Sequence, residues 1–300
     1  MKLRRALLVV VFLAAAAPAR AQTLLRFPAN DPKGVYFRLN LIIHVDHDPE
    51  DKPLEVECVN YNGQGFPWCY DQHEGTDFLL INGFGTMNAF DVEVVAAADG
   101  VVTKTVDGNY DRCHADGMSV SCDGHPMASN HVVLRHPDGI ETFYHHLKKG
   151  SVKVTTGQQV ACGDVLGYVG SSGMSAMPHL HFEVHDNTGA VLDPYAGPKS
   201  QPQSYWTEQQ GPLGLPGERC QGDPVPGDTG VGHVDAGGAP DSSLTTVVDG
   251  PVVASGDGSS DDPPLARTSG CTTGNGRHRA AVPLLLVLLL FLCTARRRRS

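Results

Sequence analysis

Short apolar runs, each interrupted by glycine, proline or aspartate, dominate the body of this 300-residue chain and limit what it can fold into. No stretch between residues 22 and 197 keeps the 3.6-residue apolar period of a long amphipathic helix. Short runs of β-branched and aromatic residues between turn residues are typical of strands. The sequence therefore predicts a mainly β fold with a hairpin turn at Pro137-Asp138-Gly139. The clearest runs are residues 92–106, 131–136, 140–147, 165–170 and 179–184.

The charged residues are distributed unevenly, and their distribution excludes some classes of protein. Residues 22–270 hold 13 of the 23 Lys and Arg and all 33 Asp and Glu, which gives this segment a net charge of −20. A body this acidic argues against nucleic acid as a partner, because nucleic-acid binding needs a basic surface. With 19% charged and 41% hydrophobic residues, the chain is neither wholly disordered nor a multi-spanning membrane protein.

The N-terminus has the order of segments that a secretory signal peptide shows. Basic residues precede an apolar run at 6–17 and a small-residue site that ends at Ala21. We expect residues 1–21 to be a signal peptide, with a buried N-terminal helix as the alternative. Residue 22 is Gln rather than Cys, so a lipid-modified N-terminus is not indicated. The mature protein is therefore expected in the periplasm or at the cell surface.

Two further segments follow the predicted folded body. Residues 198–270 are rich in Gly, Pro, Ser and Asp, a composition that predicts a flexible, disordered linker because it buries too little apolar surface. Residues 271–300 combine Cys271, an apolar stretch at 280–295 and four terminal arginines. This arrangement resembles the MYXO-CTERM type of sorting signal of myxobacterial surface proteins, with a plain tail anchor as the alternative. Either one predicts an attachment to an envelope membrane, although the stretch is slightly shorter than the roughly 17–25 residues that cross a bilayer.

Histidines are frequent, and ten of the 14 lie within residues 73–185. The strongest pattern is HLHFEV, which begins at His179. Because side chains i and i+2 of a strand point to the same face, His179 and His181 project together while Leu180 and Phe182 point into the core. Two paired histidines on a well-packed strand indicate a functional site, with two ordinary surface histidines as the alternative.

Two other segments carry candidate site residues. His145 and His146 are adjacent, so strand alternation allows only one of them on a given face and does not decide which. His73 and Asp77 are suitable zinc ligands, but a spacing of four also arises by chance. The glycine between them interrupts any helix, so this is not the helical H-E-x-x-H pattern. We therefore expect Glu74 to be a loop residue rather than a general base.

The remaining histidines of the body are interpreted as structural residues. His185 continues the face of HLHFEV and is expected at its rim. His44 and His47 lie among aspartates, where a solvated acidic loop is favoured over a second metal site. The others, which we interpret as loop or structural residues, are His114, His125, His131 and His136.

The six cysteines outside the C-terminal segment suggest disulfides, because an even number in an exported body is typical of a disulfide framework. Cys58–Cys69 and Cys113–Cys122 are expected because each pair closes a short loop that contains glycine. Cys162–Cys220 then follows by elimination. A Cys/His zinc site within residues 113–125 is the alternative.

Taken together, several motifs resemble the lysostaphin-type, or LytM-type, zinc endopeptidases. The resemblance implies a compact antiparallel β-sheet core of the duplicated hybrid motif type, with a groove that holds one Zn²⁺, in a domain over residues 73–197. It also implies hydrolysis of peptide bonds in the stem peptides or cross-links of peptidoglycan. The motifs, in chain order, are HEGTDF, VVAAADGVV, SNHVVLRHPDG, ETFYHHL, GQQVACGDVLGYVGSSG and MPHLHFEV.

The resemblance also assigns roles to individual residues. The family's Y-x-H-L motif selects His146 over His145. Inactive relatives, which activate cell-wall amidases, typically lack some of the site residues, whereas all are present here. A non-catalytic LytM-like module that binds cell wall or activates an amidase, and an enzyme that cuts secreted proteins, remain alternatives. The implied residues are the zinc ligands His73, Asp77 and His181 and the catalytic residues His146 and His179.

Two parts of the chain depart from the family pattern. Residues 22–72 form an N-terminal extension, expected to be partly β with one strand within 35–45, and lack a recognised cell-wall-binding module. Residues 107–129 form a long loop where family members usually have a brief glycine-rich turn.

Overall fold

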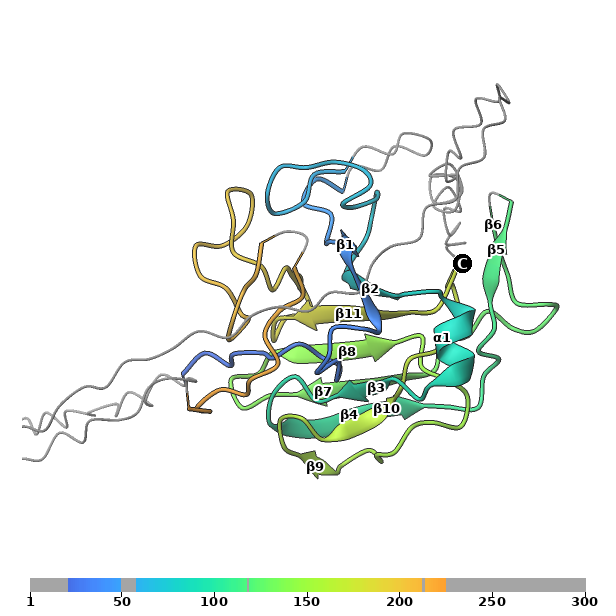
Figure 1. Cartoon of the computed structure of the whole chain (residues 1–300). Helices are drawn as coiled ribbons and strands as arrows, with labels where there is room; N and C mark the ends of the chain where they lie inside the picture. The colour runs from blue at the N-terminus through green and yellow to red at the C-terminus, as the bar shows by residue number, and fades with distance from the viewer. Residues whose placement is uncertain (1–20, 50–57, 118, 212–213, 225–300) are drawn as a thin grey trace, which may run out of the picture. The chain divides into compact units, whose positions relative to one another are not determined.

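A computed structural model describes residues 21–49, 58–117, 119–211 and 214–224 (Figure 1). Residues 1–20 of the predicted signal peptide, the linker beyond residue 224 and the predicted sorting segment lie outside the described residues. Within the described ranges, no helix is both long and apolar enough to cross a membrane.

Antiparallel strands make up most of the regular structure, so the prediction of a mainly β fold with an antiparallel core is confirmed. The main sheet has the order β1-β2-β11-β8-β7-β4-β9, with β12 paired to β11, while β3–β10 and β5–β6 form two-stranded sheets. The elements are β1 (Phe37–Ile43), β2 (Thr76–Leu80), α1 (Phe84–Ala89), β3 (Glu93–Val95), β4 (Gly100–Val106), β5 (His114–Asp116), β6 (Ser119–Ser121), β7 (His131–Arg135), β8 (Glu141–His145), β9 (Gln159–Val160), β10 (Val165–Tyr168), β11 (His179–His185) and β12 (Val191–Leu192).

The hairpin turn and the first strand of the sequence prediction are both present. β7 and β8 are antiparallel neighbours, and the N–H of Gly139 closes their turn by donating to the carbonyl of His136 at 3.0 Å. Gly139 has a φ of 98°, a conformation that glycine adopts without a steric cost. β1 lies inside the 35–45 segment and pairs with β2.

β11 lies between β2 and β8 and positions the residues of interest (Figure 1). Its alternate residues Leu180, Phe182 and Val184 are fully buried in the core. The period of two therefore turns His179 and His181 to the opposite face, as predicted. Register then decides their neighbours, since His181 lies across from Asp77 on β2 and from His145 on β8.

The N-terminal extension packs into the same core as the predicted peptidase domain. Phe27 and Phe37 are both fully buried. The Phe27 ring stands edge-on to those of Phe37 and Phe78, with centroids 5.2 and 5.0 Å apart. Residue 73 is therefore not a structural boundary, because edge-to-face aromatic packing joins the extension to β2.

The segment from residue 198 to residue 224 also belongs to this unit, so the prediction that a flexible linker begins at 198 is wrong for its described part. Trp206 is buried, forms a parallel bridge with Leu25, and packs its ring 5.6 Å from that of Phe182. Average composition over 198–270 missed this packing because one large aromatic residue anchors a segment that is otherwise polar. Burial of Trp206 alone removes a large apolar surface from water.

All three expected disulfides are present, and they include the pair that was reached by elimination. Cys58–Cys69 and Cys113–Cys122 close local loops, whereas Cys162–Cys220 spans 58 residues and ties the C-terminal part of the unit to the loop before β10. Cys113 and Cys122 are bonded to each other, which rules out the alternative of a Cys/His zinc site in this loop.

Trp206→Ala is expected to lower the free energy of unfolding by about 3–5 kcal/mol, because truncation of a buried aromatic side chain leaves a cavity. Urea unfolding followed by circular dichroism measures the change. Leu39→Ala, at a half-exposed position of β1, is the control and should stay within about 0.5 kcal/mol of the wild type. An equally small effect of Trp206→Ala would contradict the assignment of residues 198–224 to the folded unit.

Candidate metal centre and active site

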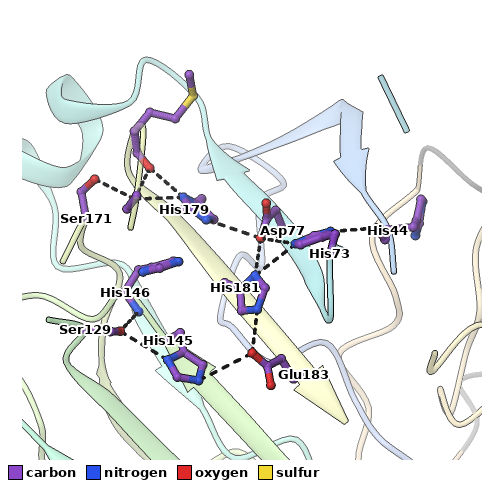
Figure 2. Close-up of polar contacts among 12 residues, drawn as sticks. His44, His73, Asp77, Ser129, His145, His146, Ser171, His179, His181 and Glu183 are labelled. Atoms are coloured by element: carbon purple, nitrogen blue, oxygen red, sulfur yellow. Dashed lines mark hydrogen bonds and ion pairs between the residues drawn. The ribbon is translucent and has the colours of Figure 1, made fainter. Parts of the chain in front are cut away.

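Three potential ligand atoms converge where β2 and β11 meet (Figure 2). Asp77 Oδ1 lies 2.8 Å from His181 Nδ1 and 3.2 Å from His73 Nε2, and the two nitrogens lie 3.1 Å apart. Nitrogen and oxygen ligands about 2.0–2.2 Å from a tetrahedral zinc ion are about 3.3 Å from one another. The three side chains therefore fit one zinc-sized cation with little rearrangement.

Local backbone structure explains how these side chains come so close. His73 lies in the turn before β2 and is 2% exposed, and Asp77, on β2, is 3% exposed. Gly75 lies between them, and a Cβ atom there would meet His181 Nε2 and the carbonyl oxygen of Phe182 at 2.8 Å. Only glycine fits at this position, because any side chain would push β11 and its imidazole away from β2.

The outer nitrogen of each imidazole is hydrogen-bonded, which sets its proton. His73 Nδ1–H donates to the His44 carbonyl at 2.8 Å, and His181 Nε2–H donates to the Glu183 carboxylate at 2.9 Å. A carbonyl and a carboxylate can only accept, so in the neutral form of each ring the lone pair is on the nitrogen that faces Asp77. Such outer partners are typical of metal-binding histidines.

The electrostatics of the metal-free cluster favour a positive charge at its centre. Burial lowers the pKa of His181, but hydrogen bonds to Asp77 and Glu183 outweigh burial and raise it to about 10. Burial raises the pKa of Asp77, but the nearby imidazoles of His73 and His179 hold it well below its usual range. A buried carboxylate that stays ionised is compensated by a cation, which is either a proton on His181 or a metal ion.

His146 and His179 lie beside this cluster (Figure 2). Their ring centroids are 4.6 Å apart, and His146 is 5.6 Å from His181. His146, His179 and His181 form a second group that could hold a metal ion. The group with Asp77 is the better site, because its three ligand atoms lie within 3.2 Å of one another and its carboxylate adds a negative charge.

Main-chain carbonyls orient both of these imidazoles. His146 Nδ1–H donates to Ser172 O at 2.6 Å, and His179 Nδ1–H donates to Met177 O at 2.7 Å. In the neutral form of each ring the lone pair is therefore on Nε2, and His179 Nε2 lies 3.4 Å from Asp77 Oδ1. Burial, followed by the nearby His179 and His181, holds the pKa of His146 well below its usual value, so its imidazole is neutral.

Both members of the His145-His146 pair reach the site, so the expectation that only one of them could do so is wrong. The His145 ring lies 5.8 Å from His181, across the sheet, and burial lowers the pKa of His145 to about 3. His146 follows β8 with a φ of 64°, in the left-handed region. This reversal breaks the strand alternation and turns the second imidazole towards His179.

Residues 71–194 match Peptidase family M23. The matching segment holds the convergent His73, Asp77 and His181 together with His146 and His179. The match to a peptidase family, with relatives named as metalloproteases, supports a peptidase.

Individual relatives match over segments of 112–123 residues. A DD-carboxypeptidase/endopeptidase Mpg of Neisseria meningitidis is 34% identical over 41% of this chain and 22% of its own length. The peptidoglycan DD-endopeptidase ShyA of Vibrio cholerae is 41% identical over 37% of this chain and 20% of its own length. The catalytic domain of lysostaphin from Staphylococcus simulans is 26% identical, with 44% of this chain and 82% of that chain covered and a TM-score of 0.28. The chain spans about a fifth of the length of the curated relatives it matches.

Outside the M23 segment, the prediction of a solvated loop at His44 and His47 is wrong. His44 is fully buried, and His47 Nε2 lies 2.7 Å from the buried Asp193 carboxylate. Asp46 accepts hydrogen bonds from the N–H groups of Asp48 and Gln72. This loop helps to orient the candidate ligand His73, since the His44 carbonyl accepts a hydrogen bond from His73 Nδ1–H.

The sequence also left some residues of this candidate site unassigned. Glu183 shares the face of His179 and His181, and the same period of two that paired the histidines could have identified it. The carbonyls of Ser172 and Met177 carry no sequence signal, because any residue has a carbonyl and only the loop conformation aims it. Glu74 is exposed, in agreement with its interpretation as a loop residue.

Proposed function

We propose that the chain is an exported zinc metalloendopeptidase that hydrolyses peptide bonds in peptidoglycan stem peptides or cross-links. The observation that carries the proposal is the convergence of His73, Asp77 and His181, with two further oriented imidazoles beside them. The names of the relatives, which include a peptidoglycan DD-endopeptidase, support the substrate class. The three disulfides support a location outside the cytosol, where disulfides persist.

The ligand set suits zinc. Two imidazole nitrogens and one carboxylate oxygen are ligands that zinc accepts, and three protein ligands are typical of catalytic zinc sites. Bound there, zinc would polarise the scissile carbonyl and make water a nucleophile at neutral pH. His73, Asp77 and His181 would hold the ion, and Glu183 and the His44 carbonyl would keep two of these ligands in orientation.

His146 and His179 would move the protons of the reaction. Each presents the lone pair of Nε2, since Nδ1–H is committed to a carbonyl, and so can accept a proton from the attacking water. Once protonated, the same atom can donate to the oxyanion or to the leaving amine. Positioned acid–base groups of this kind typically contribute about 10²–10⁴-fold to the rate.

The proposal is tested by incubating the whole chain with purified peptidoglycan, with and without a chelator, and analysing the released fragments by mass spectrometry. We expect fragments with newly freed amino and carboxyl groups, fewer fragments with chelator, and recovery on addition of zinc. Fragments that do not depend on metal would overturn the zinc mechanism. Binding to peptidoglycan without fragments would indicate the non-catalytic module, and cleavage of casein alone would indicate a protein substrate.

Glu183→Gln is expected to weaken zinc binding by about 10- to 100-fold, the usual cost of removing the outer partner of a metal-binding histidine. The change keeps the shape of the side chain but removes the negative charge that faces His181 Nε2. Competition with a chromophoric chelator measures the zinc affinity. Glu74→Gln makes the same chemical change at an exposed position and should leave both affinity and cleavage within about twofold.

A further inference from the structure

The long loop over residues 107–129 forms a small hairpin apart from the main sheet (Figure 1). Its strands β5 and β6 are joined at their open end by the disulfide Cys113–Cys122. Both cysteines are buried, and Cys122 Sγ lies 3.5 Å from the carbonyl oxygen of Gly173. The disulfide therefore contacts a second segment, residues 171–177, which we call the serine loop.

Main-chain hydrogen bonds fasten the base of the hairpin along the serine loop. The N–H of Cys113 donates to Ser171 O at 2.9 Å, and the N–H of Ala115 donates to Ala176 O at 2.9 Å. In the other direction, the Ser171 hydroxyl donates to Cys113 O at 2.7 Å. The first strand of the hairpin thus runs along the serine loop, and its hydrogen bonds satisfy polar groups that are buried there.

The serine loop in turn orients both imidazoles beside the metal site. Ser172 O accepts from His146 Nδ1–H, and Met177 O accepts from His179 Nδ1–H. A second route runs through side chains: the Ser171 hydroxyl lies 2.8 Å from that of Ser175, which lies 3.2 Å from His179 Nδ1. Figure 2 shows Ser171, His146 and His179 on one side of Asp77.

We propose that the Cys113–Cys122 disulfide is a positioning device for the two proton-transfer histidines. By closing the hairpin, it holds the serine loop in the one conformation that aims its carbonyls at His146 and His179. The metal ligands come from β2, β11 and the turn before β2, so metal binding does not depend on the disulfide. The inference rests on the proposed function for the roles of the two histidines, whereas the contacts stand by themselves.

The test compares Cys113→Ser/Cys122→Ser with Cys162→Ser/Cys220→Ser in the whole chain. In the second pair, Cys162 Sγ lies 3.6 Å from the carbonyl oxygen of Ala97 rather than beside the serine loop, so this pair controls for general loss of stability. For the first pair we expect kcat for peptidoglycan fragments to fall at least tenfold, with zinc affinity and KM within about threefold of the wild type. For the control pair we expect kcat to stay within about threefold.

A readout that does not need activity separates this inference from the proposed function. In the ¹⁵N-labelled, zinc-loaded chain, the Nδ1–H protons of His146 and His179 should exchange slowly with water, because both donate to main-chain carbonyls. Loss of Cys113–Cys122 should speed their exchange at least tenfold. If the wild type cleaves nothing but this change is seen, the proposed function fails and the positioning role stands. Unchanged exchange overturns the inference.

A single hydroxyl provides a second variant in case the double cysteine variant does not fold. Ser171→Ala keeps the disulfide but removes both the bond to Cys113 O and the contact with Ser175. We expect lower kcat and faster Nδ1–H exchange at His179, with zinc affinity unchanged. Ser151→Ala removes a buried hydroxyl that accepts from the N–H of Tyr168, outside the serine loop, and is the matched control. If Ser171→Ala and Ser151→Ala have the same kcat and the same Nδ1–H exchange rate at His179, the positioning role is contradicted.

Discussion

His181→Ala is expected to abolish metal binding and peptide cleavage together. His181 Nδ1 lies closer to Asp77 Oδ1 than His73 Nε2 does, and its loss leaves two ligands where a catalytic zinc site has three. It also removes the imidazole that bridges the Asp77 and Glu183 carboxylates, so each of them loses one compensating partner. Metal analysis after dialysis should give less than about a tenth of one zinc per chain, and the peptidoglycan assay should release no fragments above background.

The matched control for this variant is His125→Ala. It removes an imidazole that is exposed and stacks on Tyr110, outside the metal site. It should retain one zinc per chain and wild-type cleavage, and circular dichroism should show that both variants are folded. A His181→Ala chain that still binds one zinc and still cleaves would falsify the assignment of His181 as a ligand.

His146→Asn is expected to lower kcat by about 10²–10⁴-fold while zinc stays bound, because it removes a proton acceptor but no proposed ligand. Asparagine is the appropriate replacement, since it tolerates the left-handed φ of 64° that alanine would populate at a cost. Steady-state kinetics on a defined stem peptide, together with zinc analysis of the same sample, separates lost catalysis from lost metal. Loss of zinc in step with activity would instead make His146 a ligand, in the second group of three histidines.

His145→Asn is the comparison that isolates the contribution of position 146. It removes the neighbouring imidazole, which contacts the Ser129 hydroxyl at 3.3 Å and lies 3.8 Å from the Glu183 carboxylate. We expect a loss of less than about tenfold, because His145 does not share the carbonyl-oriented arrangement of His146 and His179. A larger loss for His145→Asn than for His146→Asn would transfer the proton-transfer role to His145.

The predictable part of this protein is local. The alternation of HLHFEV placed His179 and His181 on one face and Leu180 and Phe182 in the core, because strand geometry repeats every two residues. The short runs between turn residues predicted the antiparallel strands for the same reason. Two of the three disulfides followed from loops short enough to bring their ends together by themselves.

Other features depended on residues far apart in the chain. Residues 22–72 were predicted to be a partly β extension and the residues after 197 a flexible linker, yet Phe27 and Trp206 are buried in one core beside Phe78 and Phe182. Composition cannot show this, because the free energy of burying one aromatic ring comes from a partner that the local sequence does not contain. For the same reason, the local sequence did not show that His44 is fully buried.

The candidate site also has features that follow from local sequence and features that depend on contacts between distant segments. The sequence by itself determined which residue types were available and which of them shared a strand face, and the family resemblance supplied the candidate roles. Only the tertiary structure decided that β2 and β11 pair in the register that brings Asp77 to His181, and that the backbone reverses at His146. It also decided that a disulfide-closed hairpin fastens the loop that orients both histidines. Register, backbone reversal and loop contacts all depend on packing between distant segments, whereas strand alternation depends only on the geometry of neighbouring residues.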